Sequence, residues 1–225
     1  MTIAGRSEAP PGRAEVLESR PSPMDGFDPE QLGSRLRALR ELRGLSVREL
    51  GRRLGISASA VSQIERGLMT PSVNRLLAMV TAMEANLSDV FDASATPAHA
   101  TPSEPAAASG YVLSRGAAAP VELDGGVLFR SLAPTSTRGV DFFESTYPPG
   151  VHAGGSHERI THSGYEVGTV TSGTLTIQFP DGTVELGPGD SITFPCELPH
   201  RIGNRHDEPA VATWLIVHEA GGSQT

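Results

Sequence analysis

Residues 46–67 have the sequence SVRELGRRLGISASAVSQIERG, and this stretch decides the fold of the N-terminal part of the chain. Ser46 can cap a helix, and Glu49 three residues later completes a capping-box pattern. Gly55 is placed to end that helix, because glycine adopts the left-handed conformation that helix ends favour. The stretch therefore predicts two short helices that meet at Gly55, the second beginning near Ser57.

Further helices are expected on both sides of this pair. Asp28 and Pro29 form an N-cap followed by the first helical position, and leucines then repeat at helical spacing. After the pair, the turn at residues 70–72 precedes another apolar stripe, and a short helix is expected to begin near Ser88. The predicted fold of residues 27–93 is thus a bundle of five short helices.

The second helix of the central pair has the properties of a DNA-reading helix. Its small polar residues would let it lie deep in the major groove, where Gln63 can pair bidentately with adenine and serines can bond base edges or phosphates. Neighbouring arginines can hold the phosphates of the duplex without reading its sequence. The DNA-binding residues that we expect are Arg48, Ser57, Ala58, Ser59, Ser62, Gln63 and Arg66.

This segment resembles the Xre family of phage-repressor-like regulators. The residues that carry the resemblance are G-I-S-x-S-x-V-S-x-I-E-R-G at 55–67, and the similarity extends over about residues 32–91. Membership of this family would imply a helix-turn-helix DNA-binding domain. It also implies that Arg40 of the first helix pairs with Glu65 at the end of the recognition helix.

One position departs from the family pattern. The family implies a glutamine at the start of the second helix, aimed at the DNA, where this chain has Val47. Arg48 is the candidate to replace that contact. Family members usually bind inverted repeats as dimers. An alternative is a helical bundle kept only for packing or dimerisation, as in some members attached to enzymes.

Charge is distributed unevenly along the chain, which has a net charge of −8 and no lysine. Residues 35–66 contain eight arginines against three glutamates, whereas the chain from Tyr111 onward contains six arginines against thirteen acidic residues. A basic block joined to an acidic block is typical of a two-domain DNA-binding protein. The overall negative charge therefore does not exclude a nucleic-acid partner.

The sequence also indicates the compartment. It has no apolar run near the roughly 20 residues that cross a bilayer, and its N-terminus lacks the apolar core of a secretion signal. The lone Cys196 excludes an internal disulfide and is typical of a reducing compartment. We expect a soluble protein of the cytoplasm.

Composition divides the chain into four parts. Residues 1–26 are rich in Pro, Gly, Ser and charged side chains and predict a disordered tail before the helical domain at 27–93. Residues 94–110 are mostly Ala, Pro, Ser and Thr and predict a flexible linker. Such a linker would weaken rigid coupling between the helical domain and the part of the chain that follows it. In residues 111–220, short alternating runs separated by Gly and Pro predict many strands, and hence a sandwich or barrel.

Two motifs in the strand-rich part resemble those of the cupin family. They are His162-x3-Glu166-x6-Gly173 and Gly189-x5-Pro195-x3-Pro199-His200-x3-Asn204. The resemblance spans roughly residues 140–217 and implies a double-stranded β-helix, or jelly-roll barrel, whose interior holds a metal or an organic ligand. An Xre domain followed by a cupin is a familiar combination among bacterial regulators. The expected fold class is therefore multidomain, α then β.

The cupin resemblance implies a metal site made of His162, Glu166 and His200, a set that suits Fe(II) and also admits Zn²⁺ or Ni²⁺. The complete cupin pattern has another histidine where this chain has Ile160, so an organic ligand or water bonded to the same residues stays open. We expect a ligand pocket near these side chains and a buried, unreactive Cys196. The pocket residues that we expect are His157, which could also be a fourth ligand, Tyr165, Phe194 and Trp214.

Together these features favour a sequence-specific transcription regulator. It would bind an inverted-repeat operator in double-stranded DNA as a homodimer, with a small-molecule effector in the cupin barrel. One alternative is an enzyme, because the two-domain plan with this triad resembles the hydroxypropylphosphonate epoxidase family of mononuclear non-haem iron enzymes. However, the chain has no lysine with which to grip a phosphonate. A second alternative is an architectural or antitoxin-like DNA binder with an inert barrel.

Overall fold

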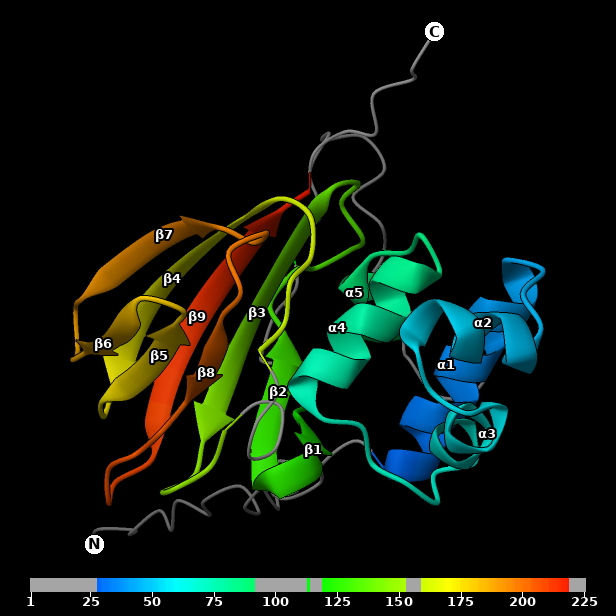
Figure 1. The fold of residues 1–225 in the computed structure, drawn as a ribbon, viewed down its shortest axis with the longest axis horizontal. Coiled ribbons are helices and arrows are strands. Elements are labelled where there is room, and N and C mark those ends of the chain that lie inside the picture. The colour runs from blue at the N-terminus through cyan, green and yellow to red at the C-terminus, as the bar shows by residue number, and fades with distance from the viewer. Residues whose placement is uncertain (1–27, 92–112, 114–118, 153–158, 219–225) are drawn as a thin grey trace, which may run out of the picture.

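The computed structural model describes residues 28–91, 113, 119–152 and 159–218, arranged as a helical unit followed by a β-rich unit (Figure 1). The predicted tail at 1–26 and the predicted linker at 94–110 lie outside the described residues. None of the helices in the described residues combines the length and the apolar composition of a membrane span. The predicted order, helices first and strands after, is confirmed.

The helical unit contains α1 (Pro29–Leu42), α2 (Val47–Leu54), α3 (Ala58–Glu65), α4 (Val73–Ala82) and α5 (Leu87–Phe91). Gly55 ends α2 with a φ of 65°, in the left-handed region that glycine tolerates, so the predicted helix pair is confirmed. Each of the first four helices is capped by a side chain that accepts a backbone N–H bond, and the caps are Asp28, Ser46, Ser57 and Ser72.

The packing of α1 against α3 depends on a glycine. A Cβ atom at Gly33 would collide with the backbone carbonyl oxygen of Ile64, so the two helices approach more closely than a larger residue would permit. Around this contact lie fully buried apolar side chains that make the core of the helical unit, among them Leu32, Leu36, Leu50, Val61 and Leu76. This close approach fixes the direction in which α3 projects.

The β-rich unit contains β1 (Val121–Leu123), β2 (Val127–Ser131), β3 (Val140–Tyr147), β4 (Tyr165–Ser172), β5 (Leu175–Phe179), β6 (Gly182–Leu186), β7 (Ser191–Pro195), β8 (Arg201–Gly203) and β9 (Ala210–Val217). A short 3₁₀ turn, η2 (Asp124–Gly126), joins β1 to β2. One antiparallel sheet has the order β1-β2-β3-β9-β4-β7, and the other has the order β6-β5-β8. Two facing antiparallel sheets with these crossovers form the jelly-roll barrel expected from the sequence.

Side chains alternate between the barrel interior and its outer surface along the long strands. In β9, the residues at 210, 212, 214 and 216 are buried and those between them are not. The ring of Trp214 lies over Gly168 of β4, where a Cβ atom would overlap it. The indole N–H of Trp214 donates a 3.0 Å bond to the hydroxyl of Ser145, so the barrel interior holds satisfied polar groups as well as apolar ones.

The helical unit contacts the barrel directly, which the sequence did not predict. Phe91 of α5 stacks on Phe129 of β2 with ring centroids 5.5 Å apart, and Phe129 stacks on Phe143 of β3 at 4.6 Å. Asp141 of β3 is 2% exposed and accepts a 2.7 Å hydrogen bond from the N–H of Leu87 at the start of α5. Buried contacts therefore join the two units in addition to the covalent connection.

Figure 1 shows the consequence of this joint for the orientation of the helices. Helices α4 and α5 lie beside the barrel, next to β2 and β3, whereas α2 and α3 lie on the side of the helical unit that faces away from it. The barrel therefore leaves the predicted recognition helix accessible.

Candidate nucleic-acid interface and metal cluster

The expected DNA-reading residues of α3 form a face without internal partners. Ser59 is exposed, and Ala58, Ser62 and Gln63 are half-buried. Among the described residues, the side chains of Ser59, Ser62 and Gln63 take part in no hydrogen bond. Their hydroxyl and amide groups therefore keep unused donors and acceptors. These side chains are therefore free to bond an external partner, as a base-reading helix requires.

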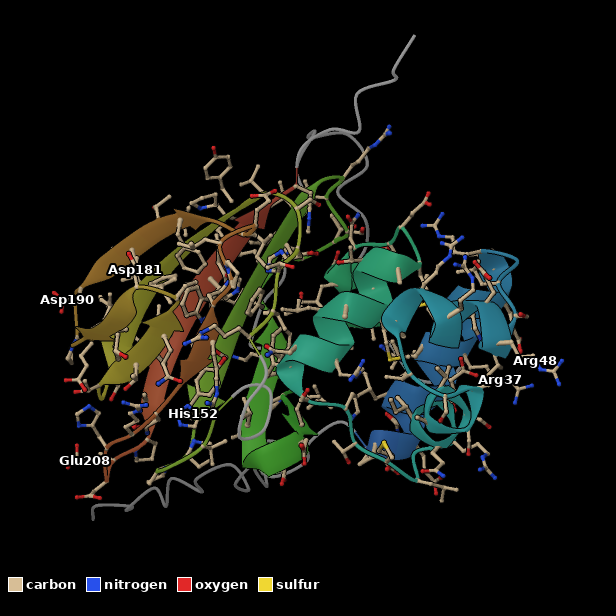
Figure 2. All side chains as sticks on the ribbon, in the orientation of Figure 1. Arg37, Arg48, His152, Asp181, Asp190 and Glu208 are labelled. Carbon is tan, nitrogen blue, oxygen red and sulfur yellow. The ribbon has the colours of Figure 1, made fainter. Side chains whose placement is uncertain are left out.

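The other expected contacts flank α3. Arg48 is exposed on α2 and points away from the barrel (Figure 2). Arg66 is exposed just after α3, and its Nε donates to the backbone oxygen of Ser62 at 3.3 Å. The hydroxyl of Ser57 caps α3, so it serves the helix as well as any external partner. Val47 is half-buried and its side chain has no polar group, so it cannot make the DNA contact that the family makes from this position. Arg48 therefore stays the candidate for that contact.

Ion pairs neutralise some arginines of the basic block and leave others free. The Glu49 carboxylate bonds Arg52 and Arg53, and these hydrogen bonds lower the pKa of Glu49 to about 2. This explains why the expected capping box is only half formed: Ser46 accepts from the N–H of Glu49, but the carboxylate is directed to the arginines. Within the described residues, the arginines with no carboxylate within 4.0 Å include Arg43, Arg48 and Arg66. Arg43 was not among the DNA-binding residues expected from the sequence.

A buried ion pair positions the end of α3. Arg40 of α1 and Glu65 of α3 are each 6% exposed, and the guanidinium donates two bonds to the carboxylate, at 2.6 Å from Nε and 2.9 Å from Nη2. Arg40 also donates to the backbone oxygen of Leu45 between α1 and α2. The pair expected from the resemblance is therefore present, and it ties α3 to the two preceding helices.

In the barrel, three side chains converge to form what we call the metal cluster: His162, Glu166 and His200. One ligand atom from each lies within 4.8 Å of the others. The Oε2 atom of Glu166 is 3.8 Å from Nε2 of His162 and 3.5 Å from Nε2 of His200. Glu166 points inward by the alternation of β4, and His200 is held by a bridge to Ile160 just before β8.

The hydrogen bonds of the two imidazole rings leave the same atom free in each. Nδ1 of His200 lies 2.9 Å from the backbone oxygen of Leu198, and Nδ1 of His162 lies 3.4 Å from that of Ser163. A proton on Nδ1 that donates to a carbonyl leaves the Nε2 lone pair available as a ligand. Both Nε2 atoms and Oε2 of Glu166 are buried without a hydrogen-bond partner. The residues present therefore fit a divalent cation.

Burial favours the uncharged form of each of these three side chains. Desolvation raises the pKa of Glu166 to about 8 and lowers the pKa of His162 to about 4. The pKa of His200 is also lowered, chiefly by burial. Two neutral imidazoles and a carboxylic acid are the donor set that a cation would convert into ligands by displacing one proton.

The structure places the expected pocket residues in different surroundings. Phe194 is buried, and its ring centroid is 4.9 Å from that of His200, so it lies against the metal cluster. Trp214 is buried within the barrel but bonds Ser145. Tyr165 is not in the interior: it is 51% exposed on the outer face, because its neighbour Glu166 points inward.

Two further expectations concern the same region. His157 lies outside the described residues. Cys196 is fully buried, and burial raises the pKa of its thiol to about 12, so the thiolate needed for redox or nucleophilic chemistry is not formed near neutral pH. His152 lies beside β8 and forms an isolated antiparallel β-bridge with Gly203 (Figure 2).

Comparisons with known proteins identify both units. Residues 31–90 match a helix-turn-helix domain, and residues 144–216 match a cupin domain. The chain is 28% identical over 177 residues to the HTH-type transcriptional regulator PuuR of Escherichia coli, covering 76% of this chain and 86% of that protein. It is 40% identical over 58 residues to the uncharacterized HTH-type transcriptional regulator y4dL of Sinorhizobium fredii, covering 26% of this chain and 30% of that protein.

A solved structure shares the fold over most of this chain. The crystal structure of an HTH_3 family transcriptional regulator from Vibrio cholerae superimposes with a TM-score of 0.61 at 23% sequence identity. The match covers 85% of this chain and 97% of that one. The fold, a helical unit followed by a β-rich unit, is therefore shared with this structure.

Proposed function

We propose that the chain, which matches a helix-turn-helix domain and a C-terminal cupin domain, is a transcription regulator whose α3 reads an operator sequence. In this role it acts on double-stranded DNA in the cytoplasm. The barrel binds a small-molecule effector and changes the affinity for the operator.

The observation that carries the proposal is the state of α3. Its polar face has no partner within the described residues, it faces away from the barrel, and the buried Arg40–Glu65 pair holds it in place. Among the described residues, Arg43 at the end of α1, Arg48 on α2 and Arg66 after α3 have no carboxylate within 4.0 Å. A free polar helix face surrounded by free guanidinium groups is what reading bases and holding phosphates requires.

Selection from a random-sequence DNA pool tests this proposal without knowledge of the operator. We expect one sequence to be enriched, bound at least about a thousandfold more tightly than random DNA, with an affinity that falls as salt increases. Binding without enrichment of any sequence would leave only an architectural DNA binder. No binding at low salt would exclude a DNA-binding role.

We propose further that the metal cluster holds a divalent cation. When bound, the cation would supply a positive charge and open coordination positions to the barrel interior. The fit of His162, Glu166 and His200 supports this proposal, because their three free ligand atoms are buried and otherwise unsatisfied. Fe(II), Zn²⁺ and Ni²⁺ are compatible with this donor set.

A homodimer is the assembly that we propose. An apolar strip crosses the outer face of three adjacent strands, since Phe142, Leu215 and Val167 are in register on β3, β9 and β4, and so are Val140, Val217 and Tyr165 in the next row. Phe142 is 38% exposed and Val217 is 41% exposed. A second copy on this face would cover the strip and present two copies of α3 to the two half-sites of an inverted repeat.

A regulatory role fits the barrel better than catalysis does. The matched relatives are HTH-type transcriptional regulators, and two candidate reactive groups of the barrel, Cys196 and Tyr147, are buried with pKa values raised by desolvation. The metal cluster is the observation that supports the alternative of an iron enzyme. Oxygen consumption by the Fe(II)-loaded protein, compared with a Glu166→Gln variant, distinguishes the two, and we expect no enzyme-dependent consumption.

A further inference from the structure

A cavity of about 490 Å³ lies between the helical unit and the barrel. One wall comes from α4 and the end of α2, and the other comes from residues 159–162, which lead into β4. Its volume falls within the range of small-molecule sites, roughly 300–1,000 Å³. His162 of the metal cluster lies in the barrel wall, so the cavity adjoins the cluster without being part of the barrel interior.

The charges in the lining are predominantly positive. Arg53, Arg75 and Arg159 line the cavity, and Glu84 is the one acidic residue in the described lining. Arg53 is committed to Glu49 and to the backbone oxygen of Ala82. Among the described residues, the side chain of Arg75 makes one hydrogen bond, of 3.5 Å to the backbone oxygen of Leu54, and Arg159 has no carboxylate within 4.0 Å.

A buried amide adds a second, independent sign of a ligand. Asn74 of α4 lines the cavity and is 7% exposed, yet its Nδ2 has no hydrogen-bond partner in the described structure. An unpaired buried donor costs on the order of 1–3 kcal/mol, so native proteins rarely retain one without a partner. That nitrogen has less than 1 Å² of exposed surface, so a ligand in the cavity that carries acceptor atoms would satisfy it once the Asn74 amide turns toward the cavity.

We propose that this cavity binds a small organic anion, a dicarboxylate or a phosphate monoester, held by Arg75 from the helical unit and Arg159 from the barrel, with Asn74 donating to it. Arginine forks match carboxylate and phosphate oxygens, and Asn74 adds a neutral donor. Apolar side chains complete the lining and would contact the carbon skeleton of such a ligand: Leu54, Leu77, Ala78 and Ile160.

The position of the cavity gives its occupant a regulatory role. A ligand that bonds both walls stabilises the docked arrangement of the two units and thereby fixes α2 and α3 relative to the barrel. In a dimer held through the barrel, that arrangement sets the spacing of the two recognition helices. This consequence rests on the proposed DNA-binding function, but the binding of the anion does not.

Isothermal titration calorimetry on the full chain, treated with a chelator, tests the proposal with three probes: succinate, glycerol 3-phosphate and ethylenediamine. We expect one of the two anions to bind once per chain and the diamine not to bind. Arg75→Gln and Arg159→Gln should each weaken binding at least about tenfold, because each removes a charged hydrogen-bond donor. Arg75→Lys, which retains the charge, should weaken it less than Arg75→Gln.

Arg138→Gln is the matched control, because Arg138 is exposed in the turn before β3 and does not line the cavity. It should leave anion binding unchanged. The proposal is overturned if neither anion binds at millimolar concentration, or if both arginine variants bind as the wild type does. Binding that appears only after a metal is added would also overturn it, since the metal cluster would then be the anion site.

Operator binding, measured on the same proteins, separates this inference from the proposed function. Specific operator binding by a chain that takes up neither anion contradicts the cavity proposal alone. Anion binding by a chain that selects no DNA sequence contradicts the proposed function and leaves the cavity proposal standing. With both present, the bound anion should change the operator dissociation constant of the wild type but not that of Arg75→Gln.

Discussion

Arg40 and Glu65 illustrate how one buried pair controls a recognition helix. Both side chains are withdrawn from water, and each satisfies the other with two hydrogen bonds. Desolvating the two charges offsets much of their attraction, so the pair contributes more to the position of α3 than to net stability. Removing one partner, however, leaves the other charge buried without compensation.

Glu65→Ala should therefore lower the free energy of unfolding by about 3–5 kcal/mol, because it leaves the buried Arg40 guanidinium with only a longer, 3.5 Å contact to the carboxylate of Glu41. Urea unfolding followed by circular dichroism measures this. The control is Arg37→Ala, which removes an exposed partner of Glu41 on α1 without touching Arg40 and should change stability little. Equal effects of the two substitutions would contradict the structural role given to the buried pair.

At the metal cluster, Glu166→Gln tests whether a cation is bound. The amide keeps the shape of the side chain but cannot supply an anionic ligand. Zn²⁺ or Ni²⁺ should raise the melting temperature of the wild type and not that of the variant, since a ligand at about 100 times its dissociation constant stabilises by about 2.7 kcal/mol. A surface variant, His206→Gln, should respond as the wild type does. No shift in the wild type would show that the cluster binds no such metal.

At the scale of elements, the joint between α5 and β3 depends on Asp141. One of its oxygens accepts from the N–H of Leu87, and the other lies 2.8 Å from Nε2 of His218 at the end of β9. The bond to Asp141 raises the pKa of His218 above its ordinary value. The Asp141 carboxylate therefore connects the start of α5 with the end of β9.

This connection predicts a pH dependence of stability. Below about pH 6.5, His218 is protonated in both the folded and unfolded states, and its pairing with Asp141 stabilises the fold. As the pH rises through the raised folded-state pKa, that contribution is lost. The wild type should thus lose more stability between about pH 6 and about pH 9 than His218→Gln does, as measured by urea midpoints. Parallel pH profiles for the two proteins would contradict this pairing.

Elements defined by local signals were predictable from the sequence. Serine caps and Gly55 mark the ends of α2 and α3, and the order of helices and strands follows from periodicity alone. The contact of Asp141 with Leu87 was not predictable, because 54 residues separate them and neither belongs to a motif. The position of Tyr165 could have been inferred, since a residue next to an inward Glu166 in a strand must point outward.

At the scale of the whole molecule, the outer face of the barrel offers the surface for a dimer. Phe142→Arg places a charge in the apolar strip and should convert a dimer into a monomer in sedimentation experiments. Operator affinity should fall in parallel, because each monomer would then bind one half-site alone. Arg138→Gln is the control on a neighbouring turn and should remain dimeric. A wild type that sediments as a monomer at operator-binding concentrations would contradict the dimer.

The central claim is that α3 reads DNA sequence. The measurement that tests it most directly is a titration of the selected operator and of random DNA of equal length with the wild type and with Gln63→Ala/Ser59→Ala. Gln178→Ala, in β5 of the barrel, is the control. We expect the wild type and the control to prefer the operator by at least about a thousandfold. The double variant should lose about 1–3 kcal/mol of that preference per base contact and should still bind random DNA. Equal preference in the double variant and the wild type would contradict the account.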